Sequence, residues 1–492
     1  MLKKFRSLFF PLILVSILAI LGDLMSPKRY REIAVDNYHD EHLGMYEMER
    51  NTLDVLFIGS SHVFSSVSPE DIFNDYGITA YVQGSSCQKI WQSYYYLKET
   101  YYTQKPKVVV LDTFMALDGS PQTEAFNREA IDKMKLSPAK MEAIKTAVEF
   151  NSNEENFVSY LFPIFRYHDR WEELKQEDYI WFVKGKDSPT KGFLPRIGSV
   201  PATFNELDYT NELEESNVMN ETCEVYLDKI KSLCEENGST LILAKIPTCL
   251  WNQTSSSTIS QWAEERKVEF LDYNAESKLR EEVSIDWESD SLDGGNHLNY
   301  DGAMKFTKVF GKYLSEHFSF EDKREKPKYE KWKEDYIYYK KCVDNYMLAN
   351  TADCIDYIGK LKNGDYVTLV SIGNINLHLI DLPVKLYEEF GISEEFLEKA
   401  SEKNNLLVLQ NTENIVEVTG EEDVEIKDTI AGVEWNASSR VIDGKKTFSC
   451  IWNKEEFAKE QEGVYFVVWD PVTQQIVDSV CMVFENEMEL TR

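Results

Sequence analysis

Short apolar runs alternate with helix-like stretches along the first 320 residues. Uninterrupted apolar runs bounded by turn residues are typical of buried parallel strands. Five such runs predict strands, at 53–58, 78–83, 107–112, 241–246 and 268–272. Between and after them, helices are expected at 69–76, 89–103 and 303–318. The alternation predicts an α/β fold, a doubly wound parallel sheet with helices on both faces, in a domain spanning 53–320.

An insertion rich in aromatic residues, about 115–220, interrupts this alternation. Insertions in such folds usually shape the substrate cleft. His168 and Arg170, in the run RYHDRW, are therefore candidate substrate-binding residues, and Arg170 could clamp an anionic sugar. The alternative is a structural motif packed among aromatic rings.

The pattern changes after residue 320. Residues 321–345 are strongly charged and aromatic, as expected of a linker that becomes a helix. Beyond them, strands are predicted at 366–372, 406–410, 415–418, 446–451 and 464–469, with helices at 382–390 and 394–403. Residues 346–492 are thus predicted to form a separate, smaller, β-rich α+β domain.

The N-terminus carries three cations, at residues 3, 4 and 6, before an apolar run from 8 to 21. No small-x-small cleavage site follows. We expect an uncleaved signal anchor, one transmembrane helix at 1–25, with a juxtamembrane segment at 26–52. Basic flanks stay in the cytoplasm, so the main domains are expected outside the cell membrane. A cleaved signal peptide is the alternative.

Composition narrows the function classes. The net charge of −32 repels nucleic acid and anionic lipid, and 43% hydrophobic residues are enough to build cores. None of the eight cysteines forms a CxxC pair, so a zinc knuckle is not expected. Disulfides and buried thiols both remain open for them. They are Cys87, Cys223, Cys234, Cys249, Cys342, Cys354, Cys450 and Cys481.

The first predicted strand ends in a Gly-Ser-Ser turn, within LDVLFIGSSHVFSSVSP (53–69). A serine at the C-terminal end of a strand lies where parallel sheets place their ligands. Ser61 is the candidate nucleophile, preferred over Ser60, and its N–H with that of Gly84 is the candidate oxyanion hole. The alternative is an ordinary strand-to-helix turn with Ser61 as the helix N-cap.

The candidate base follows by elimination among seven histidines. We set aside the histidines in the juxtamembrane segment, at the linker, in the second domain and next to Ser61. His168 and His297 remain. The segment DGGNHLNYDGA (293–303) places His297 before the last helix of the domain, from where it can reach Ser61. Asp293 could orient the imidazole, with Asp290 in reserve. No metal or organic cofactor is implied.

These motifs resemble the SGNH (GDSL-like) hydrolase superfamily, and more narrowly its membrane-anchored envelope branch, which includes the alginate and cell-wall O-acetylation proteins and the D-alanyl teichoic acid protein. The resemblance covers 53–320 and implies a flavodoxin-like, three-layer fold. The family's first-block serine maps to Ser61, the second-block glycine to Gly84, and the last-block histidine to His297.

Two departures from the family pattern stand out. Position 294, three before His297, is glycine, and Asp293 lies one residue too early. The third-block asparagine has no counterpart, since the strand there ends LDTF (111–114) and offers only Thr113. Farther along, GVYFVVWDPVTQQIVDSVCM (463–482) loosely resembles the interleukin-like EMT inducer domain, whose modules bind carbohydrate or partner proteins.

Together these features predict an extracytoplasmic serine acyltransferase or acylesterase that acts on acyl groups, above all O-acetyl groups, of an envelope polysaccharide. The resemblance also implies a multipass, acyl-donating membrane partner. The alternative is a non-catalytic, membrane-anchored scaffold or carbohydrate-binding protein in polysaccharide assembly.

Overall fold

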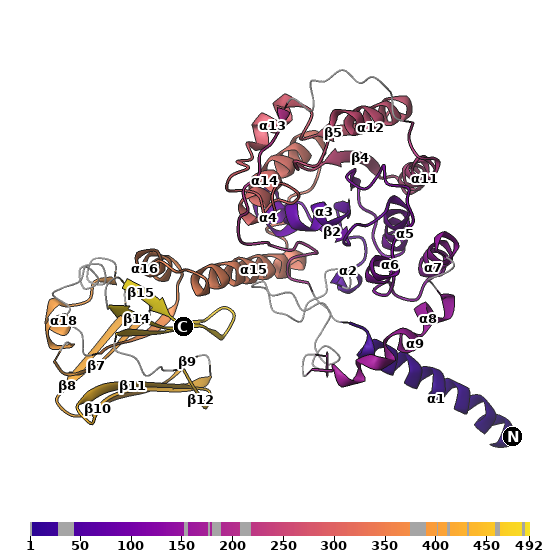
Figure 1. Cartoon of the computed structure of the whole chain (residues 1–492). Coiled ribbons are helices and arrows are strands. Elements are labelled where there is room, and N and C mark those ends of the chain that lie inside the picture. The colour runs from indigo at the N-terminus through magenta and orange to yellow at the C-terminus, as the bar shows by residue number, and fades with distance from the viewer. Residues whose placement is uncertain are drawn as a thin grey trace. The chain divides into compact units, whose positions relative to one another are not determined.

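The computed structural model describes residues 2–27, 44–151, 156–175, 178–179, 188–206, 218–373, 390–400, 402–410, 414–430, 432–457, 463–484 and 488–492. The chain divides into two compact units, Met1–Ile337 and Tyr338–Arg492. Their helices and strands are labelled in Figure 1.

The first unit is built on a five-stranded sheet in the order β2-β1-β3-β4-β5, with every pairing parallel. The strands are β1 (Val55–Gly59), β2 (Ala80–Gly84), β3 (Val108–Asp112), β4 (Thr240–Lys245) and β5 (Glu269–Asp272). The predicted doubly wound α/β sheet is confirmed. From β1 the chain adds β2 on one side and then β3, β4 and β5 on the other, so the strand order reverses between β1 and β3. In such sheets, ligands bind at the C-terminal ends of the strands beside this switch point.

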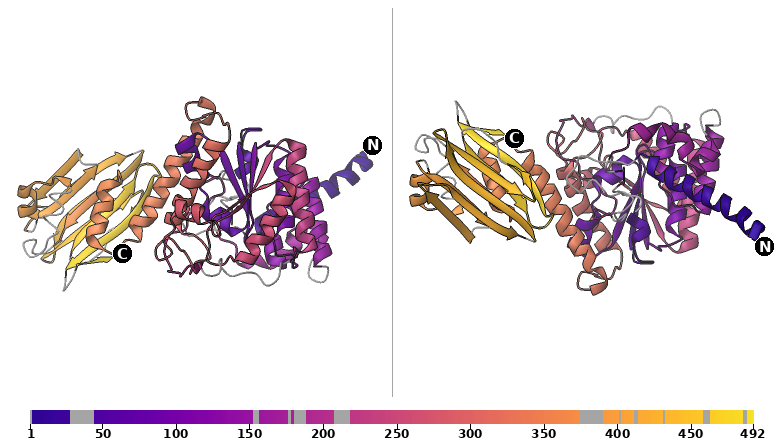
Figure 2. Two further views of the ribbon diagram at one scale, coloured as in Figure 1. Left: turned by 90° about the horizontal axis from the view of Figure 1, so that it is seen from above. Right: turned by 90° about the horizontal axis from the view of Figure 1, so that it is seen from below.

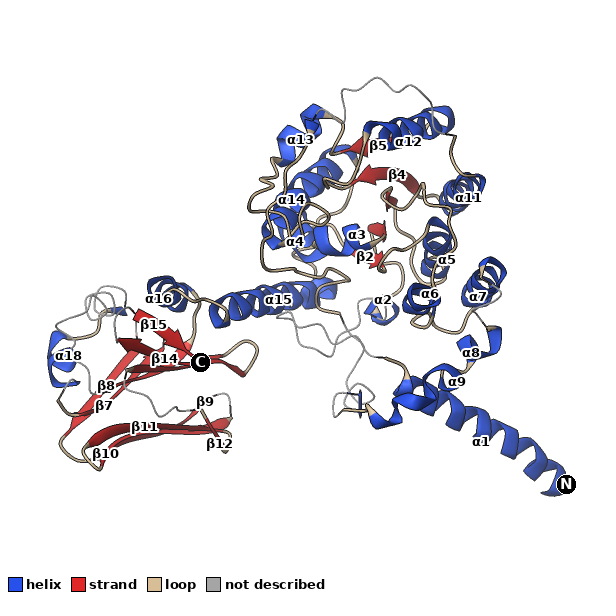
Figure 3. Ribbon diagram, in the orientation of Figure 1, coloured by secondary structure: helices blue, strands red, loops and turns tan. Residues whose placement is uncertain are grey.

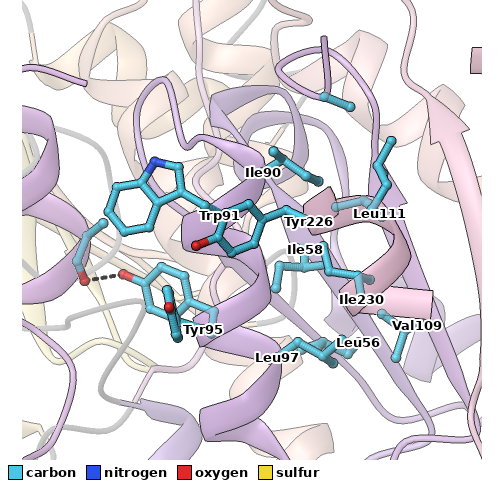
Figure 4. Packing of buried hydrophobic residues seen from close by; sticks show 14 of the residues in the cluster. Leu56, Ile58, Ile90, Trp91, Tyr95, Leu97, Val109, Leu111, Tyr226 and Ile230 are labelled. Carbon is cyan, nitrogen blue, oxygen red and sulfur yellow. Dashed lines mark hydrogen bonds between the residues drawn. The ribbon is translucent and has the colours of Figure 1, made fainter. Parts of the chain in front are cut away.

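Successive side chains of each strand enter two different cores, one on each face of the sheet. Leu56 and Ile58 pack with α5 and α11, as Figure 4 shows, whereas Val55 and Phe57 pack with α14. Figure 2 shows the strands running between the two layers of helices. Full burial on both faces explains why these strands read as continuous apolar runs.

The helices of this unit carry the following bounds. They are α1 (Leu2–Met25), α2 (Gly44–Glu47), α3 (Ser61–Ser66), α4 (Pro69–Tyr76), α5 (Ile90–Thr100), α6 (Glu124–Ile131), α7 (Pro138–Phe150), α8 (Phe157–Leu161), α9 (Ile164–Tyr167), η1 (His168–Glu172), α11 (Glu221–Asn237), α12 (Gln253–Arg266), α13 (Ser277–Val283), α14 (Tyr300–His317) and η3 (Pro327–Tyr329).

Helix α14 begins three residues before the position expected from its apolar spacing. The side chain of Asn299 accepts a hydrogen bond from the N–H of Gly302 and caps the helix. Such a cap satisfies one of the N–H groups that lack an intrahelical acceptor. The cap lies two residues after His297 and the helix begins three residues after it, so the start of α14 holds the end of the loop that carries this histidine.

Residues 2–25 form the helix α1, as expected for an N-terminal anchor. Within the part of the chain that the structure describes, however, no helix combines the length and the apolarity needed to cross a membrane. The predicted transmembrane helix is therefore not confirmed. The apolar run at residues 8–21, which only Pro11 and Ser16 interrupt, is shorter than the roughly 20 residues that a span requires.

The second unit is rich in strands, as Figure 3 shows, which confirms the predicted β-rich domain. Its two sheets have the orders β15-β14-β13-β6-β7-β8 and β12-β11-β10-β9. The strands are β6 (Val367–Ile372), β7 (Asn404–Gln410), β8 (Asn414–Gly420), β9 (Val424–Ile430), β10 (Val433–Ile442), β11 (Lys445–Trp452), β12 (Glu455–Glu456), β13 (Val464–Asp470), β14 (Gln475–Phe484) and β15 (Met488–Thr491).

Side chains of both sheets share one core of this unit, which contains Leu369, Trp435 and Trp469. The helices α16 (Cys354–Asn363) and α18 (Glu394–Ala400) contribute to a second core on the other face of the larger sheet. Helix α15 (Glu330–Ala349) contains the boundary between the two units. The predicted helix at 382–390 lies outside the described residues apart from its last position.

All eight cysteines are free thiols, and six of them are buried. Between the two alternatives that the sequence left open, the structure therefore has thiols rather than disulfides. Burial raises the pKa of the Cys249 thiol to about 11, so it is a weak nucleophile at neutral pH.

Candidate active site

The turn after β1 presents Ser61 at the C-terminal edge of the sheet. Ser60 takes the N-cap position in an extended conformation, and Ser61 is the first residue of α3. The alternative in which Ser61 is the cap is therefore wrong. A Cβ on Gly59 would lie 2.7 Å from Val63 Cγ2 and 2.9 Å from Asp112 Cβ, so only glycine lets the strand turn this closely into the helix.

Ser61 and His297, which are 236 residues apart in sequence, meet at this edge. The Oγ atom of Ser61 lies 2.7 Å from Nε2 of His297. The other ring nitrogen of His297, Nδ1, lies 2.7 Å from Oδ2 of Asp293. A carboxylate accepts the hydrogen bond, so Nδ1 carries the proton and Nε2 is the acceptor for the Ser61 hydroxyl. The three residues thus have the connectivity of a serine–histidine–aspartate triad.

Asp293 also holds the backbone of the histidine that it orients. Its second oxygen, Oδ1, accepts a hydrogen bond of 2.8 Å from the N–H of His297. The chain between them curls through Gly294 (φ 74°) and Gly295 (φ 94°), both in the left-handed region that favours glycine. Two consecutive glycines thereby absorb the extra residue in DGGNH, and the aspartate reaches the ring from four positions away instead of three.

The reserve candidate, Asp290, is engaged elsewhere. Its carboxylate is buried, lies 2.5 Å from Nζ of Lys305, and accepts a hydrogen bond from the N–H of Asp286. These contacts tie the loop to α14. Asp293 is therefore the carboxylate that contacts the histidine, and Asp290 is a structural residue of the same loop.

Gly84, the proposed second oxyanion donor, ends β2 directly beside the nucleophile turn. It is in register with Gly59, and an added Cβ would lie 2.9 Å from the carbonyl oxygen of Ser60 and 3.0 Å from that of Gly59. The N–H of Ser61, at the start of α3, has no intrahelical acceptor because of its position. The backbone of Gly84 thus lies against the turn from which Ser61 starts α3.

Thr113, the residue directly after β3, has a buried hydroxyl. The residue is fully buried, and its Oγ1 has no hydrogen-bond partner among the described residues. Its backbone N–H is bonded to the carbonyl of Ala244.

A second histidine, which the sequence analysis set aside, lies behind the first. His62 is 1% exposed, and its ring is stacked on that of His297 with centroids 4.7 Å apart. It was set aside because it is next to Ser61, but α3 turns its side chain inward, toward the loop that carries His297. The only feature of the sequence that could have indicated this position of His62 is that it follows the serine in the first turn of a helix after a strand.

A buried ion pair lies under the site at the ends of β3 and β4. Nζ of Lys245 is 3.7 Å from Oδ1 of Asp112, and both side chains are almost completely inaccessible. Burial raises the pKa of Asp112 and lowers the pKa of Lys245. Oδ2 of Asp112 lies 3.5 Å from the Ser60 hydroxyl, which connects the pair to the nucleophile turn.

The predicted substrate-binding residues do not join the site. Arg170 donates to the carbonyl of Met25 at 2.7 Å and pairs with the buried carboxylate of Asp178 at 3.0 Å. His168 is exposed and lies 3.0 Å from Asp169. Arg170 therefore caps the C-terminal end of α1, where unpaired carbonyls favour a cation, and its guanidinium is already engaged. The contacts of Arg170 are with a helix end and a carboxylate rather than with aromatic rings.

The described residues contain no group of three or more His, Cys, Asp or Glu side chains arranged to hold a metal ion.

No family model matches the chain, and neither does any curated protein. Two solved structures overlap with it loosely. One is described as an acylhydrolase from Bacteroides fragilis NCTC 9343; it is 12% identical, with 57% of this chain and 97% of that chain covered at a TM-score of 0.28. The other is a GDSL-like lipase from Bacteroides thetaiotaomicron VPI-5482, 12% identical, with 56% and 95% covered at a TM-score of 0.27. Overlaps this loose assign no activity to the chain.

Proposed function

We propose that this protein is a serine acyl hydrolase or acyltransferase with Ser61 as its nucleophile. The single observation that carries the proposal is the chain of two 2.7 Å contacts, from Ser61 Oγ to His297 Nε2 and from His297 Nδ1 to Asp293 Oδ2. A nucleophile, a base and an orienting carboxylate in this order activate a serine hydroxyl. The side chain of His297 is 18% exposed, so the base is partly accessible to solvent.

The reaction begins when Ser61 Oγ attacks the acyl carbonyl carbon while its proton moves to Nε2 of His297. Asp293 stabilises the resulting imidazolium through Nδ1–H. We assign the N–H groups of Ser61 and Gly84 as the donors to the negative oxygen of the tetrahedral intermediate. When the intermediate collapses, the leaving alkoxide takes the proton from Nε2, and the acyl group stays on Ser61 as an ester.

In the second half, His297 takes a proton from water or from an acceptor hydroxyl, whose oxygen attacks the acyl ester. Collapse releases the acid or the new ester, and Ser61 regains the proton from Nε2. Attack by water makes the protein an esterase, and attack by a sugar hydroxyl makes it a transferase. We propose O-acyl groups of an extracytoplasmic polysaccharide as the substrate, supported by the resemblance to the envelope branch.

Turnover with two substrates tests this proposal. The full chain is incubated with p-nitrophenyl acetate alone and with an added oligosaccharide, and released nitrophenol and acetylated sugar are measured. The proposal predicts nitrophenol release that disappears in Ser61→Ala and persists in Ser60→Ala. Release that is equal in the wild type and in Ser61→Ala would contradict it.

A non-catalytic carbohydrate-binding role is the second candidate. One observation favours it, an open cleft of about 700 Å³ on the smaller sheet of the second unit. Among its lining side chains are Lys427, Asp428, Asn436 and Asn453, which offer donors and acceptors for sugar hydroxyls. Polysaccharide binding by the full chain that is lost in Asp428→Ala but kept in Ser61→Ala would support this role.

A further inference from the structure

The ring of His62 fills the space between the catalytic imidazole and the end of β3. On one side it is stacked on His297, with centroids 4.7 Å apart and an angle of 29° between the planes. On the other it lies against Phe114, with centroids 3.9 Å apart. The triad mechanism assigns no role to this ring, although it is the surface on which the base rests.

His62 also holds the backbone at the residue before the base. Its Nε2 lies 2.8 Å from the carbonyl oxygen of Asn296. A carbonyl only accepts, so Nε2 of His62 carries the proton. Its Nδ1 then faces the hydroxyl of Ser60 at 3.4 Å. One side chain therefore links the nucleophile turn to the loop that carries the base.

The surroundings keep this ring uncharged. Burial lowers the pKa of His62, and the nearby charges of Lys245 on β4 and His297 on the facing loop lower it further. Asp112 on β3 approaches it only through Ser60, which lies between the two side chains. A neutral ring with a single N–H supports an imidazolium at His297 without adding a second positive charge in contact with it.

We propose that His62 is a positioning residue that holds the His297 imidazole and the Asn296 backbone against Ser61 during acyl transfer. This inference rests on the proposed function. Misplacement of a reacting group by about 1 Å costs roughly a hundredfold in rate, and His62 restrains both the ring and the main chain of the base. It contributes to kcat rather than to substrate binding, because it is buried behind His297.

Two substitutions separate the contacts. His62→Phe keeps a stacked ring and removes the donor to Asn296, whereas His62→Gln keeps an N–H donor and removes the ring. His317→Phe changes an exposed histidine at the C-terminal end of α14 and is the matched control. The full chain is assayed for ester hydrolysis, and [¹⁵N]histidine labelling follows the Nδ1–H signal of His297, which its bond to Asp293 protects from exchange.

For both His62 variants we expect a kcat about tenfold to a hundredfold lower with KM unchanged, together with a shifted, faster-exchanging Nδ1–H signal of His297. The control keeps the wild-type values. A lower kcat with an unchanged His297 signal would overturn the positioning role, and so would wild-type kcat in both variants. If the wild type has no esterase activity, the proposed function fails, and the His297 signal still decides the role of His62.

Discussion

Glu70 gives the sharpest test of the electrostatics inside the first unit. It lies on α4 with no exposed surface, and neither carboxylate oxygen has a hydrogen bond among the described residues. Nζ of Lys191 is 3.2 Å from Oε1 but is also paired with Asp335. One buried lysine thus faces two carboxylates. Burial, opposed by Lys191, raises the pKa of Glu70 from 4.5 to about 8.

The sign of the pH dependence follows from this shift. Between pH 4.5 and about 8, Glu70 is protonated in the folded chain and ionised in the unfolded chain. The folded state binds one more proton, so the free energy of unfolding falls as the pH rises through this window. The free energy of unfolding falls by about 1.4 kcal/mol for each pH unit, and by about 5 kcal/mol over the whole window.

Glu70→Gln keeps the shape of the protonated acid and removes the titration. Urea unfolding of the first unit, followed by tryptophan fluorescence at pH 5, 6, 7 and 8, should give a variant that gains stability relative to the wild type by about 1.4 kcal/mol per pH unit. Glu316→Gln, at an exposed position of α14, is the matched control and should parallel the wild type. A Glu70→Gln curve parallel to the wild type would refute the reasoning.

Three further substitutions address the active site. Asp293→Asn should lower kcat by roughly 10²–10⁴-fold with KM nearly unchanged, because an amide no longer fixes the histidine tautomer; unchanged turnover in steady-state assays would exclude Asp293 as the orienting residue. Asp290→Asn, which breaks the pair with Lys305, should lower the Tm and leave kcat unchanged; a large loss of kcat at wild-type Tm would reverse the two roles. Gly84→Ala should lower kcat/KM about tenfold, because the added Cβ would lie only 2.9 Å from the carbonyl oxygen of Ser60. An unchanged kcat/KM would show that this contact does not shape the site.

The sheet could be predicted because its strands are buried on both faces. Runs such as Val108–Asp112 are apolar at nearly every position, and the turn at Gly59 marks where the first one ends. Strand β10 was missed, because its buried positions include Ser438 and Ser439 whereas Val441 and Ile442 at its end are exposed. In such half-exposed strands the apolar signal is divided between the two faces.

Two residues of the candidate site, Ser61 and His297, could be predicted from their positions at the ends of predicted strands and helices. The ends of β1 and the start of α14 meet at one edge of the sheet, which brings Ser61 and His297 together. The reach of Asp293 was not predictable, since it depends on the left-handed conformations of Gly294 and Gly295. The place of His62 depends on how the loop before α14 packs onto α3, and that is a tertiary contact with no local pattern.

The most direct test of the central claim is covalent labelling of Ser61. The full chain is treated with a fluorophosphonate, and the adduct is located by mass spectrometry of the intact protein and its peptides. Attack by Ser61 Oγ on phosphorus should expel fluoride and leave one adduct on the peptide 53–69, in the wild type and in Ser60→Ala. Labelling should be absent in Ser61→Ala and strongly slowed in His297→Ala. A folded wild type that stays unlabelled, or an adduct that persists in Ser61→Ala, would contradict the assignment of Ser61 as the nucleophile.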